Sequence, residues 1–127
     1  MNRIESATEI FQSHRDELGF VNRAQVREKD LVTVERNGEI AGALLGNHCV
    51  RNPQSTVYEI AVREKYRRAG VGDELVARFA SESPHDKLVA KCPIDLPANQ
   101  FYNQSGWELI AVEDGKHRGL AVWELSI

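Results

Sequence analysis

The sequence is poor in cysteine and has no long apolar run. Two cysteines, Cys49 and Cys92, occur in 127 residues, and neither belongs to a CxxC pair. A disulfide framework is therefore not expected, and the default compartment is a reducing one, the cytoplasm. The first residues, MNRIESATEI, contain two acids and no apolar h-region, and no run reaches the length that spans a bilayer. We expect neither a typical signal peptide nor a membrane segment.

Metal-binding and common nucleotide-binding patterns are also missing. The four histidines are scattered along the chain, at His14, His48, His85 and His117. His48-Cys49 has no matching pair of ligands elsewhere, so we expect no metal. The Walker pattern G-x-x-x-x-G-K-S/T is absent, and the Rossmann pattern G-x-G-x-x-G fails because Leu75 occupies its third glycine position.

The composition is that of one ordinary globular domain. Hydrophobic residues make up 42% and charged residues 28% of the chain, and 127 residues suffice for one core, so we expect a single domain over residues 1–127. The net charge of −3 does not favour wholesale attraction to nucleic acid or to an anionic membrane.

The N-terminal third predicts helices followed by a hairpin. Ser6 and Glu9 have the spacing of a capping box, and helical periodicity continues to Gly19, through Ile10, Phe11, His14 and Leu18. A second short helix is expected over residues 22–28. The stretch LVTVERNGEIAGALLG predicts two strands joined by Asn37-Gly38, a pair suited to a type I′ turn.

The middle of the chain predicts a strand, a helix and another strand. Residues 55–62, STVYEIAV, form the expected third strand. A helix is expected from about Gly70 to before Pro84, because its apolar residues form one stripe, at Val71, Leu75, Val76, Phe79 and Ala80. KLVAKC, residues 87–92, has the pattern of a short buried strand.

The C-terminal part predicts a helix and two strands. DLPANQFYNQSG is expected to be a helix with Asp95 as its N-cap, Pro97 in its first turn and Gly106 at C′. Strands are then expected over residues 107–113 and 119–126, joined by Glu113-Asp114-Gly115. The order ααβββαβαββ predicts an α/β (α+β) fold, in which helices flank a mixed sheet.

The stretch YRRAGVGDEL combines charge and missing side chains at a predicted helix start. A helix N-terminus carries roughly half a positive charge and unpaired N–H groups, which attract phosphate. Gly70 and Gly72 allow an anion to approach the backbone, while Arg67 and Arg68 add permanent charge. These features predict a diphosphate cradle, although glycines before helices and paired arginines in water are also common.

Two motifs together resemble the GCN5-related N-acetyltransferases. Val62 followed by Arg67-Arg68-Ala69-Gly70-Val71-Gly72 is similar to the family signature Q/R-x-x-G-x-G/A. ANQFYNQSGW is similar to its second hallmark, an alanine, an aromatic-tyrosine pair and then Gly-aromatic. The resemblance covers roughly residues 31–113, agrees in element order, and implies a mostly antiparallel central sheet.

The resemblance implies that acetyl-coenzyme A is the cosubstrate. The pyrophosphate is then expected at a set of loop and helix residues, Arg67, Arg68, Ala69, Gly70, Val71, Gly72 and Asp73. The thioester carbonyl and the cofactor arm are expected at the N–H groups of Ala61 and Val62, at a bulge that ends the strand. The family's usual asparagine is replaced by Asp95, so we assign the pantetheine contact to Asn99, one turn further on.

The resemblance also implies the reacting groups. Tyr102 matches the general acid that protonates the departing thiolate, since a phenol is protonated at neutral pH; the alternative is a core tyrosine beside Phe101. Glu59 is the candidate general base, three residues before Val62 on the side shared with Ala61. It could equally pair with an arginine. His48 is a second candidate base, and a nucleophilic Cys92 is disfavoured because it lies in an apolar strand.

The acceptor is expected to be an amine on a small molecule, a peptide or an aminoacyl group. The family builds its acceptor pocket from the N-terminal helices and last strands, which here contribute Phe20, Arg23, Lys116, His117, Arg118 and Trp123. The alternative interpretation of these segments, an amphipathic helix and a solvated hairpin tip, is the favoured one. A homodimer is compatible with the sequence, and nucleic acid is not favoured. The alternative is a non-catalytic module that binds coenzyme A or pairs with another protein through its sheet edge.

Overall fold

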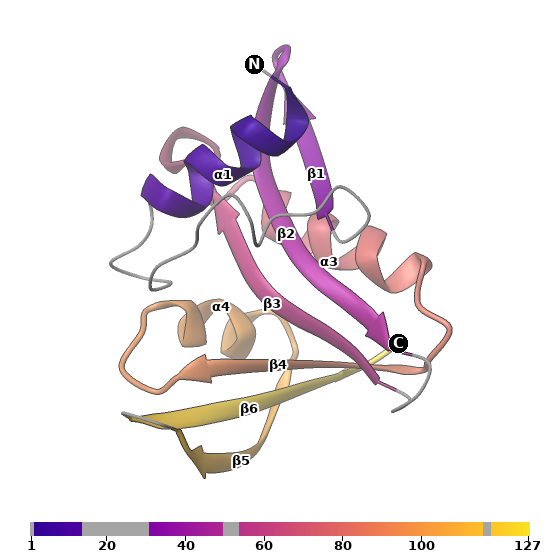
Figure 1. The fold of residues 1–127 in the computed structure, drawn as a ribbon, viewed down its shortest axis with the longest axis vertical. Coiled ribbons are helices and arrows are strands. Elements are labelled where there is room, and N and C mark those ends of the chain that lie inside the picture. The colour runs from indigo at the N-terminus through magenta and orange to yellow at the C-terminus, as the bar shows by residue number, and fades with distance from the viewer. Residues whose placement is uncertain (1, 14–30, 50–53, 116–117) are drawn as a thin grey trace. The chain divides into compact units, whose positions relative to one another are not determined.

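A computed structural model describes residues 2–13, 31–49, 54–115 and 118–127. Along the chain come α1 (Arg3–Ser13), β1 (Leu31–Arg36), β2 (Glu39–Cys49), β3 (Gln54–Val62), a 3₁₀ turn η3 (Glu64–Tyr66), α3 (Val71–Ser81), β4 (Lys87–Pro93), α4 (Ala98–Gln104), β5 (Glu108–Asp114) and β6 (Gly119–Ser126). The strand order is β1-β2-β3-β4-β6-β5 (Figure 1). The fold is the predicted mixed sheet with helices.

The sheet is mostly antiparallel. β1 pairs antiparallel with β2, and β6 pairs antiparallel with both β4 and β5. The parallel ladder joins β3 to β4 over Ser55–Val57 and Leu88–Ala90. The chain divides into two compact units, of which the first comprises Met1–Gly46 and Glu59–Glu82 and the second Asn47–Tyr58 and Ser83–Ile127.

The first unit begins its sheet with the predicted hairpin. Asn37 and Gly38 have φ of 53° and 82°, the two positive values that a type I′ turn requires. Arg3 of α1 bonds the Thr33 hydroxyl of β1, with Nε and Oγ1 2.9 Å apart, and it also donates to the Leu31 carbonyl. These bonds attach α1 to the first strand.

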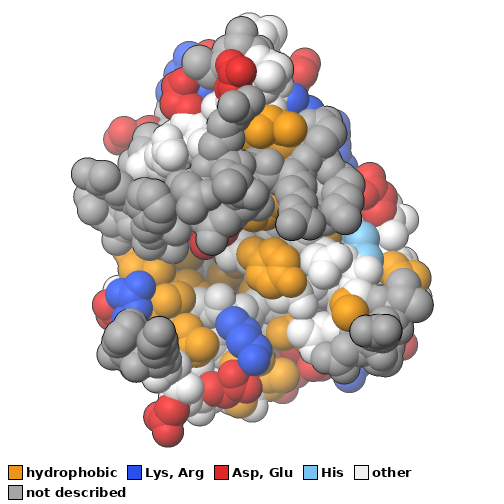
Figure 2. Space-filling view, viewed as in Figure 1, with side chains coloured by type: hydrophobic (Ala, Val, Ile, Leu, Met, Phe, Trp, Pro, Cys, Tyr) orange, Lys and Arg blue, Asp and Glu red, His pale blue; other side chains and the backbone are white. Residues whose placement is uncertain are grey.

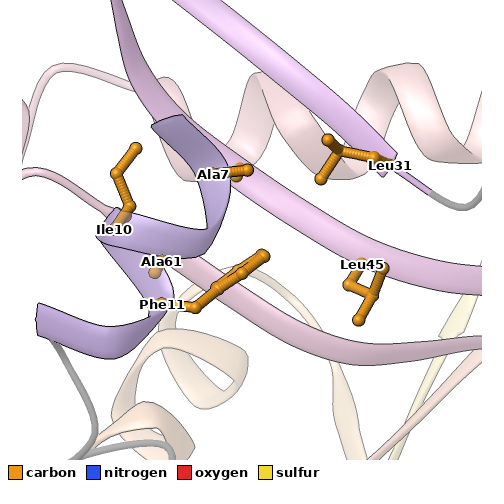
Figure 3. Packing of buried hydrophobic residues seen from close by; sticks show 7 residues of the cluster. Ala7, Ile10, Phe11, Leu31, Leu45 and Ala61 are labelled. Atoms are coloured by element: carbon orange, nitrogen blue, oxygen red, sulfur yellow. The ribbon is translucent and has the colours of Figure 1, made fainter. Parts of the chain in front are cut away.

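α1 covers one face of the strands in the first unit. Ala7, Ile10 and Phe11 are completely buried. They form one cluster with residues from β1, β2 and β3, namely Leu31, Ala43, Leu45 and Ala61 (Figure 3). Because side chains alternate along a strand, Gly42 between Ala41 and Ala43 belongs to the opposite face.

α3 packs on that opposite face, where Gly42 leaves room for it. A Cβ at Gly42 would lie 2.8 Å from Val71 Cγ1, 3.0 Å from the Ala61 carbonyl oxygen and 3.1 Å from Leu75 Cδ1. Val71 and Leu75 are buried and belong to the first two turns of α3. The missing side chain therefore lets the start of α3 approach β2 closely.

The second unit packs α4 on β4 and β6. Tyr102 of α4 stacks on Trp123 of β6 with ring centroids 6.1 Å apart, and its ring meets Trp107 edge-on at 5.0 Å. Gly106, with φ of 85°, follows the last turn of α4 at C′, as predicted, and the Trp107 N–H bonds the Tyr102 carbonyl at 3.1 Å. The turn at the end of α4 thus places Trp107 in the core of the second unit.

Three local predictions are wrong. α1 begins at Arg3, not after a Ser6 cap: Asn2 Oδ1 accepts the Glu5 N–H at 2.8 Å. Asp95 does not cap α4, which begins at Ala98 behind Pro97 without a side-chain cap. The last hairpin turns at Gly115 and Arg118, whose N–H and carbonyl are 2.9 Å apart, because β5 continues through Asp114.

Some predictions lie outside the described residues. They are the helix over residues 22–28, the extension of α1 through His14 and Leu18 to Gly19, and the acceptor-pocket residues Phe20, Arg23, Lys116 and His117. None of the described helices is long and apolar enough to cross a membrane.

The described surface mixes charges of both signs. On the face in Figure 2, the lysines and arginines in view stand apart from one another, with acidic, neutral and apolar side chains between them. On this face the described side chains form no continuous basic stripe of the kind that follows a nucleic-acid backbone.

We expect Gly42→Ala to destabilise the protein by about 1–3 kcal/mol, because the added methyl group overpacks the contact with α3 and meets a backbone oxygen. Chemical denaturation monitored by circular dichroism measures this change. Gly119→Ala is the matched control: its Cβ would meet the end of the Ile94 side chain at 3.3 Å, which can move aside. Equal unfolding midpoints for the two variants would show that the Gly42 contact is not tight.

Candidate active site

The cradle predicted from the sequence, residues 67–73, lies where η3 leads into α3. Gly70 is the N-cap of α3, in the left-handed conformation at φ 79°, and no side chain caps the helix. The first intrahelical bond is from the Glu74 N–H to the Gly70 carbonyl, at 3.0 Å. The N–H groups of Val71, Gly72 and Asp73 therefore precede the helical ladder and are available for an anion.

The residues before the helix add charge and curvature. Arg67, Arg68, Ala69 and Gly70 are all exposed. Arg68 has φ of 63°, which is uncommon outside glycine, and Gly70 repeats the left-handed conformation two residues later. Left-handed residues next to right-handed ones turn successive N–H groups toward a common centre, which is how backbone concavities bind anions. The cradle residues thus have a backbone shape suited to an anion, and phosphate binding there stays a prediction.

The β1–β2 hairpin holds the chain that leads into the cradle. The Tyr66 hydroxyl donates to Glu39 Oε1 at 2.7 Å, and Lys65 forms an ion pair with the same carboxylate. The Lys65 ammonium and the Tyr66 hydroxyl hold the pKa of Glu39 below its usual value. We call Glu39, Lys65 and Tyr66 the hairpin clasp. The hairpin clasp is not predictable from the sequence, because no local pattern links residues that are 26 or more positions apart.

Arg63 forms a second attachment for the same segment. Its N–H bonds the Ala41 carbonyl and its Nε bonds the Ile40 carbonyl, both at 2.8 Å. Its guanidinium also lies 3.5 Å from Glu9 Oε1 of α1. Arg63 therefore ties the end of β3 to β2 and to α1 at once.

Glu59 lies on β3 two residues before Ala61. Strand alternation places it on the same face as Ala61, the face that α1 covers. Burial alone raises the pKa of Glu59 from 4.5 to about 7. Among the described residues no arginine or lysine forms an ion pair with it, so the arginine pairing considered as an alternative is not found in this part of the chain. A carboxyl group with this pKa can accept a proton near neutral pH.

Tyr102 is enclosed by aromatic rings in the second unit. Its side chain is 4% exposed. Phe101 meets it edge-on at 5.4 Å, in addition to Trp107 and Trp123. The enclosure limits the ring to few orientations, so the hydroxyl has a defined position. The structure thus places Tyr102 in a core, as the alternative interpretation supposed, without bearing on whether it donates a proton.

Asn99 stands one turn before Tyr102 and is heavily hydrogen-bonded. Its Nδ2 donates to the carbonyls of Pro93 and Leu96, each at 2.9 Å, and its Oδ1 accepts from Trp123 Nε1 at 2.9 Å. The side chain therefore joins the end of β4 to α4 and β6. These bonds use one lone pair of Oδ1, and the second lone pair can accept a hydrogen bond from a ligand.

Asp95 and the remaining candidates have other surroundings. Asp95 Oδ2 lies 3.1 Å from Arg118 Nη1, in an exposed ion pair. His48 Nδ1 lies 2.7 Å from the Ser55 hydroxyl, in the second unit. Cys92 is buried, as expected of an inert thiol. In the described part of the chain, no group of three or more histidine, cysteine, aspartate or glutamate side chains could hold a metal.

Solved structures resemble this chain in fold. Ard1 from Thermoplasma volcanium has 23% identity and a TM-score of 0.77, with 98% of this chain and 90% of that chain covered. The ribosomal-protein-S18-alanine N-acetyltransferase from Escherichia coli has 16% identity and a TM-score of 0.73, over 100% and 90%. An aminoglycoside 6'-N-acetyltransferase in complex with coenzyme A has 11% identity and a TM-score of 0.75, over 97% and 89%.

Sequence comparison identifies the family directly. No curated protein matches the chain. The model of the acetyltransferase (GNAT) family matches residues 3–107, which include α1, the cradle and α4. Because this match extends over most of the sequence, the chain belongs to the GNAT family of acetyltransferases.

Proposed function

We propose that the protein transfers an acetyl group from acetyl-coenzyme A to a primary amine, by direct attack of the amine on the thioester. The observation that carries the proposal is the uncapped N-terminus of α3, with Arg67 and Arg68 exposed beside it, in a chain of the GNAT family. A structural neighbour bound to coenzyme A supports the choice of cosubstrate.

The cradle binds the pyrophosphate in this proposal. The N–H groups of Val71, Gly72 and Asp73 donate to phosphate oxygens, and Arg67 and Arg68 neutralise their charge. Ala69 and Gly70 let the chain approach the phosphates. Because a carboxylate repels phosphate, we assign only the backbone of Asp73 to the contact.

The end of β3 binds the thioester. The N–H groups of Ala61 and Val62 donate to the carbonyl oxygen and to the pantetheine arm, and negative charge that develops on the oxygen is stabilised by these donors. Asn99 contributes to the pantetheine contact through the remaining lone pair of Oδ1. The bulge expected at Ala61 and Val62 remains a prediction.

Glu59 and Tyr102 move the protons. The amine must be neutral to attack, and Glu59 accepts its proton, directly or through water. The new C–N bond forms at the carbonyl carbon, the C–S bond breaks, and Tyr102 gives its phenolic proton to the departing sulfur. The second proton that the nitrogen loses as the amide forms passes through solvent and restores the Tyr102 phenol. The products are an amide and free coenzyme A thiol. The acceptor is an amine of a small molecule, a peptide or an aminoacyl group.

A pair of variants separates cosubstrate binding from chemistry. We expect Tyr102→Phe to bind acetyl-coenzyme A as the wild type does, but to release thiol about 10²-fold more slowly, because the general acid is lost. We expect Arg67→Glu to abolish binding, because a carboxylate repels the pyrophosphate. Isothermal titration calorimetry and a thiol-release assay over a panel of amines, peptides and aminoacyl-tRNA measure the two effects.

The outcomes decide between an enzyme and a binding module. Arg78→Glu is the matched charge control, since Arg78 bonds the Thr33 carbonyl near the end of α3, away from its N-terminus. If the wild type gives no heat with acetyl-coenzyme A and Arg67→Glu behaves identically, the cosubstrate is wrong. Binding with no turnover on any amine would leave a non-catalytic module.

The pH dependence tests Glu59. Its pKa of about 7 predicts that the wild-type rate rises as the pH passes 7 and the carboxyl group loses its proton. Glu59→Gln should lower the rate about 10²-fold and remove this limb of the profile. Rates measured from pH 5.5 to 9 with an amine that titrates above this range check the prediction, and Glu82→Gln, an exposed carboxyl, is the control.

The pH dependence of folding stability tests the raised pKa of Glu59 independently. The pKa of Glu59 is higher in the folded chain than its ordinary value, so its contribution to stability is largest below about pH 4.5 and is lost as the pH rises through 7. Glu59→Gln lacks this loss and should therefore melt above the wild type at pH 8. A rate limb near pH 7 that persists in Glu59→Gln would assign the base elsewhere.

A further inference from the structure

β5 is an edge strand that is exposed along its whole length. Among the described residues it pairs with β6 alone, and it ends the strand order of the sheet (Figure 1). All seven residues, Glu108–Asp114, are exposed. Alternate residues of an edge strand direct their N–H and C=O groups away from the sheet, where another strand can bond them. We call Glu108–Asp114 the β5 edge.

The β5 edge carries large apolar side chains in its centre. Leu109, Ile110 and Val112 are 50%, 46% and 62% exposed. The register pairs Leu109 with Trp123 and Val112 with Ala121, so these side chains share one face of the sheet. Trp123 is the residue on which α4 packs, so Leu109 and Val112 continue the apolar face beyond the area that α4 covers.

Ile94 extends this apolar margin. Its N–H bonds the Gly119 carbonyl at 3.0 Å, and Gly119 pairs with Asp114. Ile94 is 54% exposed. A Cβ at Gly119 would lie 3.3 Å from Ile94 Cδ1 and 3.7 Å from the Glu113 carbonyl oxygen, so Ile94 lies near the C-terminal end of β5. Leu109, Val112 and Ile94 are thus three large apolar side chains, each at least half exposed.

The charges of the β5 edge are all negative and lie at its two ends. Glu113 pairs with Lys91 at 2.9 Å. Glu108 and Asp114 form no ion pair within the described residues, and the next described cation along the chain, Arg118, pairs with Asp95. An antiparallel second copy in full register would place Glu108 against Asp114, which like charges disfavour. The pattern fits a segment with cations at both ends.

A bulge limits how much of the strand can pair regularly. Between Leu109 and Ala111 the register with β6 shifts, so Ile110 is the extra residue. Bulges protect edges from pairing along their whole length. The regular stretch is Ala111–Asp114, which suits a short ladder with Val112 as its apolar contact.

We propose that the β5 edge binds, by strand addition, an extended segment of a partner protein whose apolar centre is flanked by lysine or arginine. The ladder forms on Ala111–Asp114, the apolar centre packs on Val112, Leu109 and Ile94, and the flanking cations meet Asp114 and Glu108. The inference uses none of the proposed catalytic residues.

Three labelled peptides test the proposal by fluorescence anisotropy. The first has Val-Ile-Val between pairs of lysines, the second has the same centre between pairs of glutamates, and the third has proline in place of the central isoleucine of the first. We expect the lysine peptide to bind, with an affinity that falls as the salt concentration is raised. The glutamate peptide should not bind, and the proline peptide should bind at least about tenfold more weakly, because proline donates no ladder bond.

Variants of the protein identify the surface. We expect the double variant Glu108→Lys, Asp114→Lys to lower the affinity for the lysine peptide about tenfold or more, since two attractions become repulsions. Val112→Lys should also lower the affinity for the lysine peptide, because it removes the central apolar contact. Asp86→Lys and Ile127→Lys are the matched controls, because both residues are exposed outside β5 and the Ile127 N–H bonds the Asp86 carbonyl.

Hydrogen exchange in the wild-type protein gives a readout that needs no variant. Adding the lysine peptide should slow exchange at amides of Ala111–Asp114. The proposal is overturned if the glutamate or proline peptide binds as well as the lysine peptide, if the charge-reversed variant binds as the wild type does, or if protection appears elsewhere. It is equally overturned if sedimentation shows a dimer whose β5 amides are protected without peptide.

Discussion

The contact between Gly42 and the start of α3 is the constraint on which the cradle depends. It brings Val71 and Leu75 against β2 at a distance that no side chain at position 42 would allow. The helix is thereby fixed at its first turn, the end that carries the unpaired N–H groups. An anion site made of backbone donors works only if those donors do not move, so the glycine acts through rigidity rather than through chemistry.

Electrostatics support the same segment from its other end. The hairpin clasp and Arg63 hold the chain between β3 and α3 by side chains that reach β2. Glu39 pairs with the exposed Lys65, while Arg67 and Arg68 are exposed nearer to α3, and Arg67 Nε bonds the Val62 carbonyl at 3.3 Å. Arg67 therefore braces the backbone and is exposed at the cradle at the same time.

The sequence predicted the elements well and the long-range contacts poorly. Asn37-Gly38 determines the hairpin, and the stripe through Leu75 and Phe79 determines α3, because turn chemistry and periodicity are local. Gly42 gave a readable signal, a glycine within a strand, that was not used. The hairpin clasp and the bonds from Asn99 gave none, since they join residues brought together only by folding. Asp95 failed as a cap because α4 begins only at Ala98, with Pro97 at the N-cap position.

The second unit illustrates a different balance between packing and chemistry. Tyr102 is held by three aromatic neighbours, and Asn99 satisfies two backbone carbonyls and an indole. A helix of seven residues has little intrinsic stability, so α4 depends on these tertiary contacts more than on its own hydrogen bonds. Tyr102 and Asn99 therefore stabilise the second unit, in addition to the functions proposed for them.

The buried carboxyl of Glu59 has a consequence for thermodynamics. With a pKa of about 7, roughly half of the molecules at neutral pH hold its proton and half do not. Any molecule that covers this side chain further withdraws it from water and favours the neutral form. Association would then draw protons from the buffer, so the measured heat should vary with the ionisation enthalpy of the buffer chosen.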